Sequence, residues 1–71
     1  MRVVIDVYKR PKDKAWVTDV YVNNRFSFSL VSPLRGWCLP HALHLVDKFY
    51  GDAAKIELHG DIPDELQENP S

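Results

Sequence analysis

The hydrophobic pattern of the chain changes period near residue 33, and this change constrains the fold more than any other feature. Residues 3–9 and 26–30 alternate with the period of β-strands, and residues 15–22 are rich in β-branched and aromatic residues, which favour strands. They then recur at helical spacing, at Leu39, Ala42, Leu43, Val46, Phe49 and Tyr50, before alternation returns over 55–59. The sequence therefore predicts an α+β fold with the element order β-β-β-α-β.

The chain has a basic part and an acidic part, although its formal net charge is only −1. Residues 1–50 carry eight Lys or Arg against four Asp, a net of +4, whereas 51–71 carry one Lys against six acids, a net of −5. A length of 71 residues allows one domain only. We assign residues 1–60 to a single α+β domain and residues 61–71 to an acidic C-terminal tail, with one helical turn at 63–67.

The alternation also predicts the register of the sheet. A four-residue loop at 11–14 places Val3 opposite Val22, Ile5 opposite Val20 and Asp6 opposite Asp19. A three-residue loop at 23–25 directs Phe26, Phe28 and Leu30 toward the helix. Because the first strand is apolar on both faces, we place it inside the sheet, beside the fourth strand, which a right-handed crossover returns parallel to it. The expected sheet order is 3-2-1-4.

One helix covers one face of such a sheet, so the other face stays open. The predicted register gathers Val4, Tyr8, Val17 and Tyr21 on the open face, and an apolar patch of this kind is typical of a protein interface. The third strand lies at the edge of the sheet and offers unpaired backbone groups as a second route to association. A second copy of the chain or a different protein is the expected partner.

Two other groups of residues have alternative interpretations. The carboxylates of Asp6 and Asp19, placed opposite each other, would share a proton, hold a cation or simply be solvated. A second group contains residue types that bind zinc or act as a thiol nucleophile with a histidine base: Cys38, His41, His44 and His59. Positions 38 and 44 differ by about 240° around a helix, so their side chains do not converge on one site. A buried, inert Cys38 is therefore expected, with no metal, no cofactor and no catalytic site.

Basic residues at the predicted first hairpin and beyond it give an alternative function. Their phosphate-binding side chains, with aromatic residues nearby, would suit nucleic acid. The set consists of Lys9, Arg10, Lys12, Lys14 and Arg25. The acidic tail weakens this electrostatic case.

Taken together, these patterns predict a small non-catalytic binding protein: an accessory, adaptor or inhibitor subunit. The alternative is a nucleic-acid-binding module, and an enzyme that uses Cys38 is a distant third. No apolar run exceeds three residues, so no membrane span is expected. Asp6 interrupts the stretch in which a signal peptide would be apolar, and a single cysteine excludes an internal disulfide, so a cytoplasmic location is expected.

Overall fold

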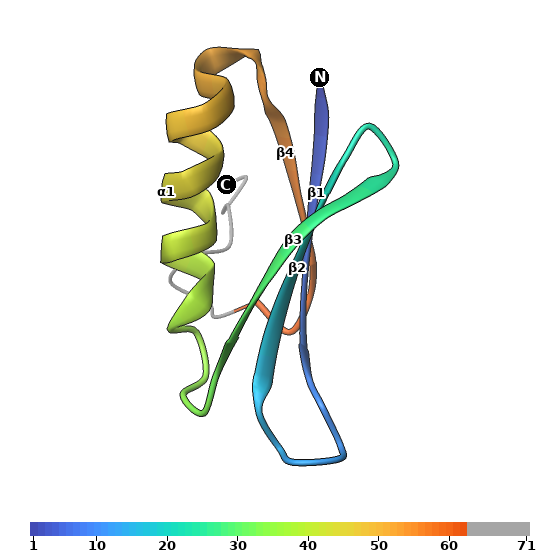
Figure 1. The fold of residues 1–71 in the computed structure, drawn as a ribbon, viewed down its shortest axis with the longest axis vertical. Helices are drawn as coiled ribbons and strands as arrows, with labels where there is room; N and C mark the ends of the chain where they lie inside the picture. Colours follow the sequence, from blue (N-terminus) through green and yellow to red (C-terminus); the bar gives the residue numbers. More distant parts are fainter. Residues whose placement is uncertain (63–71) are drawn as a thin grey trace, which may run out of the picture.

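A computed structural model of the 71-residue chain describes residues 1–62 (Figure 1). The expected helical turn at 63–67 and most of the acidic tail lie outside the described residues. The elements are β1 (Arg2–Lys9), β2 (Trp16–Val22), β3 (Arg25–Ser32), α1 (Cys38–Tyr50), a short 3₁₀ turn (Gly51–Ala53) and β4 (Lys55–Gly60). They confirm the α+β class and the β-β-β-α-β order. The four strands form one mixed sheet in the order β3-β2-β1-β4, as predicted.

The pairing of β1 follows the predicted register on both sides. β1 runs antiparallel to β2, with Val3 opposite Val22 and Asp6 opposite Asp19, and parallel to β4. The hairpin at 11–14 closes with a hydrogen bond of 2.7 Å from the Arg10 N–H to the Ala15 carbonyl. The four-residue loop therefore fixes the register that the hydrophobic pattern requires, and it leaves Asp6 and Asp19 side by side.

The turn between β2 and β3 differs from the prediction. The three-residue loop is wrong: Val22 pairs with Arg25, and the turn contains only Asn23 and Asn24, which both have positive φ, as a type I′ turn requires. A β-bulge then restores the expected pairing of Val20 with Phe28. Phe26, on the turn side of the bulge, is 59% exposed instead of facing the helix. The expectation that it joins the core is therefore wrong.

Helix α1 packs one face onto β2 and β3 and closes the core. Its residues Leu39, Ala42 and Val46 are fully buried against Val3, Ile5, Val7 and Val20. Phe49, expected in the same stripe, is 62% exposed. The cause is the twist of the sheet, because the β2–β3 hairpin bends away from the C-terminal half of the helix (Figure 1).

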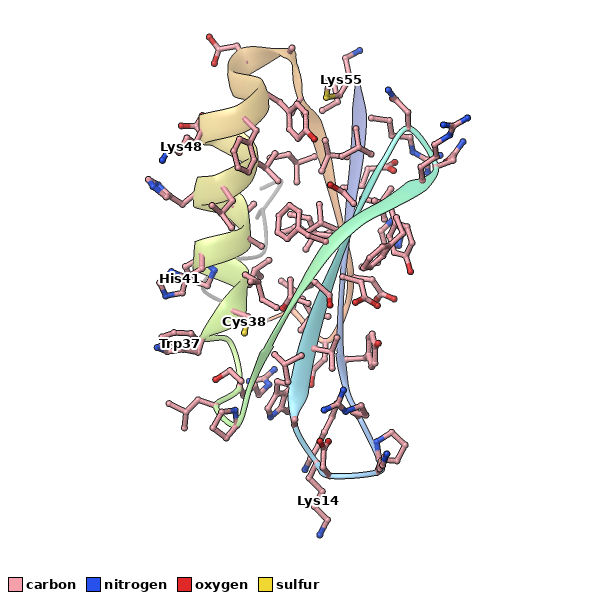
Figure 2. All side chains as sticks on the ribbon, viewed as in Figure 1. Lys14, Trp37, Cys38, His41, Lys48 and Lys55 are labelled. Atoms are coloured by element: carbon pink, nitrogen blue, oxygen red, sulfur yellow. The ribbon has the colours of Figure 1, made fainter. Side chains whose placement is uncertain are left out.

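The chain after β4 continues the same body. Ile62 belongs to the buried core, and the Arg35 guanidinium contacts the Asp61 carboxylate at 2.8 Å. Ile56 lies on the helix side of β4 but is 42% exposed, since α1 packs on β2 and β3 rather than on this edge. Within residues 1–62 no element covers the opposite face of the sheet, which Figure 2 shows with its side chains pointing away from α1. That open face is where a binding site has room to form.

Candidate functional site: the open face of the sheet

The open face is built from cross-strand rows, because residues directly opposite each other share a face. One row joins Val4, Tyr21 and Phe26, and the Tyr21 and Phe26 rings meet edge-on with centroids 5.8 Å apart. Another row joins Tyr8, Val17 and Val31 across β1, β2 and β3. Two apolar and aromatic rows thus lie on a surface that the helix does not reach.

A polar row separates the two apolar rows. It runs from His59 on β4 through Asp6 and Asp19 to Ser29 on β3. The ion pairs between residues 1 and 62 join Arg2 to Glu57, Arg10 to Asp13 and Arg35 to Asp61, and none of them reaches Asp6 or Asp19. The middle of the face is therefore a pair of carboxylates that form no ion pair within residues 1–62.

Tyr8 couples the polar row to the apolar row beside it. Its hydroxyl interacts with the Asp19 carboxylate, and this hydrogen bond, followed by partial burial and the charge of Asp19, raises the pKa of Tyr8 above its usual value. All three causes favour the neutral phenol over the phenolate. No group of three metal-ligating side chains forms within residues 1–62.

All four residues predicted for the interface lie on this face, but they are not equally accessible. Tyr8 is exposed, and Val4 and Tyr21 are half-buried. Val17 is only 3% exposed although no element of residues 1–62 covers it, since its row neighbours Tyr8 and Val31 flank it on both sides. Val17 therefore supports the two residues that a partner would touch.

Two contributors to the face were absent from the prediction. Val31 is 49% exposed, and it could have been found by extending the alternation of Ser27 and Ser29 by one more residue. Phe26 lies on this face because the turn before it has two residues, Asn23 and Asn24, in place of the expected three-residue loop. With these two residues, the apolar surface extends across the sheet to the free edge of β3.

The basic residues proposed for nucleic acid are not brought together. Lys9, Arg10, Lys12 and Lys14 lie at the β1–β2 end, whereas Arg25 lies at the other end of β2, about 23 Å away for seven residues of strand. Arg10 is also held by Asp13 in a two-point contact at 3.0 and 2.6 Å. The guanidinium, with a hydrogen bond from the Ala15 N–H, lowers the pKa of Asp13 to about 2. The charge of Arg10 is thus neutralised within the hairpin.

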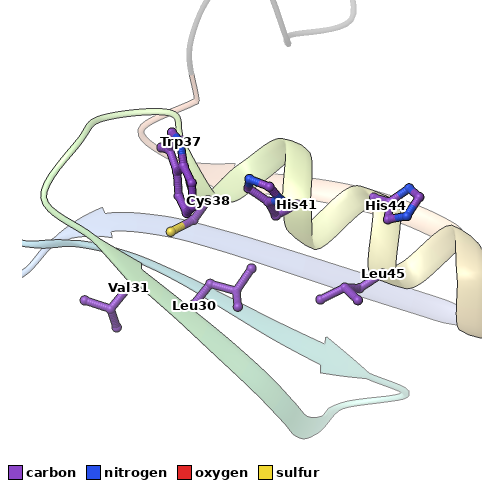
Figure 3. Close-up of a pocket in the computed structure, with 7 residues that line it drawn as sticks. All are labelled: Leu30, Val31, Trp37, Cys38, His41, His44 and Leu45. Carbon is purple, nitrogen blue, oxygen red and sulfur yellow. The ribbon is translucent and has the colours of Figure 1, made fainter.

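Cys38, His41 and His44 line a groove of about 310 Å³ between α1 and β3 (Figure 3). Leu30, Val31, Trp37 and Leu45 complete its lining. Cys38 is 2% exposed, and burial raises the pKa of its thiol, although a hydrogen bond with Ser32 acts the other way. His41 packs on the Trp37 ring at 4.4 Å between centroids. A protonated, buried thiol is a poor nucleophile, so the groove offers an apolar surface rather than a reactive one.

Comparison with known proteins assigns no relationship to this chain. No protein-family model, no curated protein and no solved structure matches it. No helix within residues 1–62 is long and apolar enough to span a membrane. The function is therefore argued from the geometry of the open face.

Proposed function

We propose that the protein is a non-catalytic binding module that docks a partner protein on the open face of its sheet. The observation that carries the proposal is the arrangement of this face: two apolar rows enclose a pair of carboxylates that no described cation neutralises. Tyrosine gives a large, amphipathic contact at low entropic cost, and Tyr8 and Tyr21 stand on either side of the carboxylates. The cytoplasm, where the single thiol stays reduced, is the proposed site of action.

Charge complementarity defines the chemistry of the partner. A partner surface that places Lys or Arg over Asp6 and Asp19 would supply the missing counter-charges. Its apolar side chains would cover Tyr8, Tyr21 and Phe26 at the same time. An acidic partner would bring like charges together, and nucleic acid would bring its phosphates against the same two carboxylates. The proposal is therefore a protein segment with a cationic side chain flanked by apolar ones.

A random peptide library displayed on phage tests this directly. Peptides selected on the wild-type protein are compared on two face variants, Tyr8→Ser/Tyr21→Ser and Asp6→Asn/Asp19→Asn, with circular dichroism as the control for folding. We expect enriched peptides to carry Lys or Arg beside aromatic or aliphatic residues, and to bind each double variant at least tenfold more weakly, about 1.4 kcal/mol. Ile56→Ser, a substitution of an exposed aliphatic residue away from this face, is the matched control and should bind normally.

The same experiment distinguishes the alternatives. Peptides that bind wild type and both face variants equally would refute the open face as the site. A 20-base-pair DNA duplex of random sequence is tested in parallel at low and moderate salt. Binding of this duplex that falls steeply with salt and is lost in Lys12→Ala/Lys14→Ala would replace the proposal with nucleic-acid binding through the hairpin.

A further inference from the structure

We propose that the free edge of β3, together with the flank of α1 beside it, is a docking surface for a second copy of this chain. Antiparallel pairing of β3 with its symmetry mate would join the two sheets into one of eight strands. This surface lies on the helix side of the sheet and differs from the open-face contact proposed above, although Ser29 and Val31 of β3 contribute to both.

The two edges of the sheet differ in how they are protected. Natural edge strands usually avoid pairing with other chains by carrying charges or proline, or by being short. β4 follows this pattern, with Lys55 and Glu57 in a six-residue strand. β3 has eight residues, its only charge is Arg25 at one end, and it contains no proline. No strand within residues 1–62 pairs with its outer edge. The sequence of β3 therefore suits a strand that is paired in the working state.

The helix beside this edge has a second apolar flank that the core does not use. Cys38, His41 and Leu45 line the groove against Leu30 and Val31 (Figure 3), and they follow one another at helical spacing. Trp37, 54% exposed, lies at one end of this flank, and Phe49 continues it toward the other. No charged side chain lines the groove. The flank and the edge lie side by side and form one surface.

Two-fold symmetry restricts the register of the pair, and we propose one of the allowed registers. Residues that pair across the two-fold axis must lie on the same face of the sheet. In the regular part of β3 that follows the bulge, two paired residues are therefore both odd-numbered or both even-numbered, so their numbers add up to an even sum. A sum of 58 pairs Ser29 with itself and Phe28 with Leu30, which keeps the apolar residues on the helix side and the bulge outside the centre. Arg25 of one copy then lies about 27 Å from Arg25 of the other, at eight residues of 3.4 Å, so these like charges do not meet.

The same symmetry places the helices at a packing distance. Strands are about 4.8 Å apart, and α1 lies over β2 and β3, so the two helix axes would be about 10 to 14 Å apart. Packed helices are about 8–10 Å apart, and large side chains such as Trp37 and Leu45 fill the difference. The two helices would run antiparallel, with Leu45 of each copy on the side that faces the axis because it lines the groove beside β3.

The estimated area reaches the lower limit of a specific interface. A strand of eight residues is about 27 Å long, and the sheet, the helix layer and their side chains are roughly 20 Å deep. The contact would bury about 540 Å² per copy, or about 1,100 Å² in total, which exceeds the ~1,000 Å² expected of a specific interface. The dimer would present two open faces on the same side of one sheet, so a partner with two docking segments would bind with avidity.

Analytical ultracentrifugation of the full chain tests the proposal. We expect wild type to sediment as a dimer at tens of micromolar, and Leu45→Glu to shift the dimer dissociation constant at least a hundredfold toward monomer. Ile56→Glu, the same kind of change at the other edge of the sheet, is the control and should remain dimeric. A monomeric wild type would overturn the proposal. So would a dimer that Tyr8→Ser/Tyr21→Ser dissociates and Leu45→Glu does not, since that would place the contact on the open face.

Cross-linking tests the register without depending on Leu45. In the proposed pair, Cα atoms of Ser29 and its mate are about 4.5–5.5 Å apart, a distance that a disulfide spans. Under mild oxidation, Ser29→Cys should form a covalent dimer. Ser27→Cys, about 13 Å from its mate at four residues of 3.3 Å, should form it at least tenfold more slowly. Equal rates for the two variants would overturn the β3 pairing.

Discussion

Substitution of Gly60 with alanine tests the parallel pairing that holds β4 beside the open face. Gly60 ends β4 opposite Val7 and has a φ of +86°. A Cβ atom there would collide with the Val7 carbonyl oxygen and would lie 2.7 Å from Oδ1 of Asp6. The same carbonyl accepts a hydrogen bond of 2.8 Å from the Asp61 N–H. The end of β4 must therefore move away from β1.

The cost of this movement has three parts. A left-handed backbone costs an alanine about 1–2 kcal/mol. Loss of the hydrogen bond to Val7 adds about 1 kcal/mol. Ile62, two residues after Gly60, is buried, and its partial exposure adds a third part. The upper limit of this part is the ~1.5–3 kcal/mol that full burial of such a side chain contributes. Gly60→Ala should therefore destabilise the fold by about 3–5 kcal/mol, a large part of the roughly 4–10 kcal/mol expected of 71 residues.

Gly51 provides the matched control for this prediction. It ends α1 with a φ of +57°, and nothing lies within 4 Å of the position a Cβ would take. Gly51→Ala should therefore cost only the backbone term of about 1–2 kcal/mol. Urea unfolding followed by far-UV circular dichroism measures both variants. If the two costs agree within about 0.5 kcal/mol, the close approach of β4 to Val7, and the reasoning built on it, is refuted.

The other predictions concern the core, the thiol and two carboxylates. Leu39→Ala should lower the free energy of unfolding by about 2–5 kcal/mol in the same urea assay, since Leu39 is fully buried. In the native protein, Cys38 should react with a thiol reagent more slowly than free cysteine does, and in denaturant it should react as fast as free cysteine; rapid labelling of the native protein would contradict its burial. Because the folded pKa of Asp13 is lowered to about 2, its contribution to stability is present above the unfolded pKa of about 3.9 and is lost as pH falls toward 2; Asp13→Asn should flatten this part of the acid-unfolding curve. Asp19→Asn should lower the pKa of Tyr8 toward 10, measured by ultraviolet titration with Tyr8→Phe as reference; an unchanged titration would show that the two groups do not interact.

Much of the fold follows from residues whose positions are set by local patterns. The four-residue loop at 11–14 and the alternation of Val3, Ile5 and Val7 are enough to pair β1 with β2 correctly. Because β1 is apolar near its start on both faces, its interior position also follows. These features were predictable since each depends on a short segment and on one rule, that the apolar side must face the helix.

The errors arise where the structure depends on more than one segment. Phe26 follows a tight Asn-Asn turn, which places it on the face opposite to the one predicted. The bulge after Phe26 returns the rest of β3 to the predicted face, and a run of alternating residues does not indicate where such a bulge lies. Phe49 fits the helical stripe, but its exposure depends on how far the twisted sheet bends away from the helix. Neither the bulge nor the twist is a property of one residue, so hydrophobic periodicity alone does not contain them.

The two-residue turn also connects the two proposed surfaces. With the expected three-residue loop, Phe26 would face the helix and the open face would end at Tyr21, one strand short of the edge. With the Asn23-Asn24 turn, the aromatic row reaches β3, the strand whose outer edge is proposed to pair with a second copy. Ser29 belongs to both surfaces, as the end of the polar row and as the centre of the proposed two-fold. Pairing at β3 would therefore continue the polar row through the axis, and Asp6 and Asp19 of the two copies would form one acidic stripe. A partner with regularly spaced cationic side chains fits such a stripe better than it fits either copy alone.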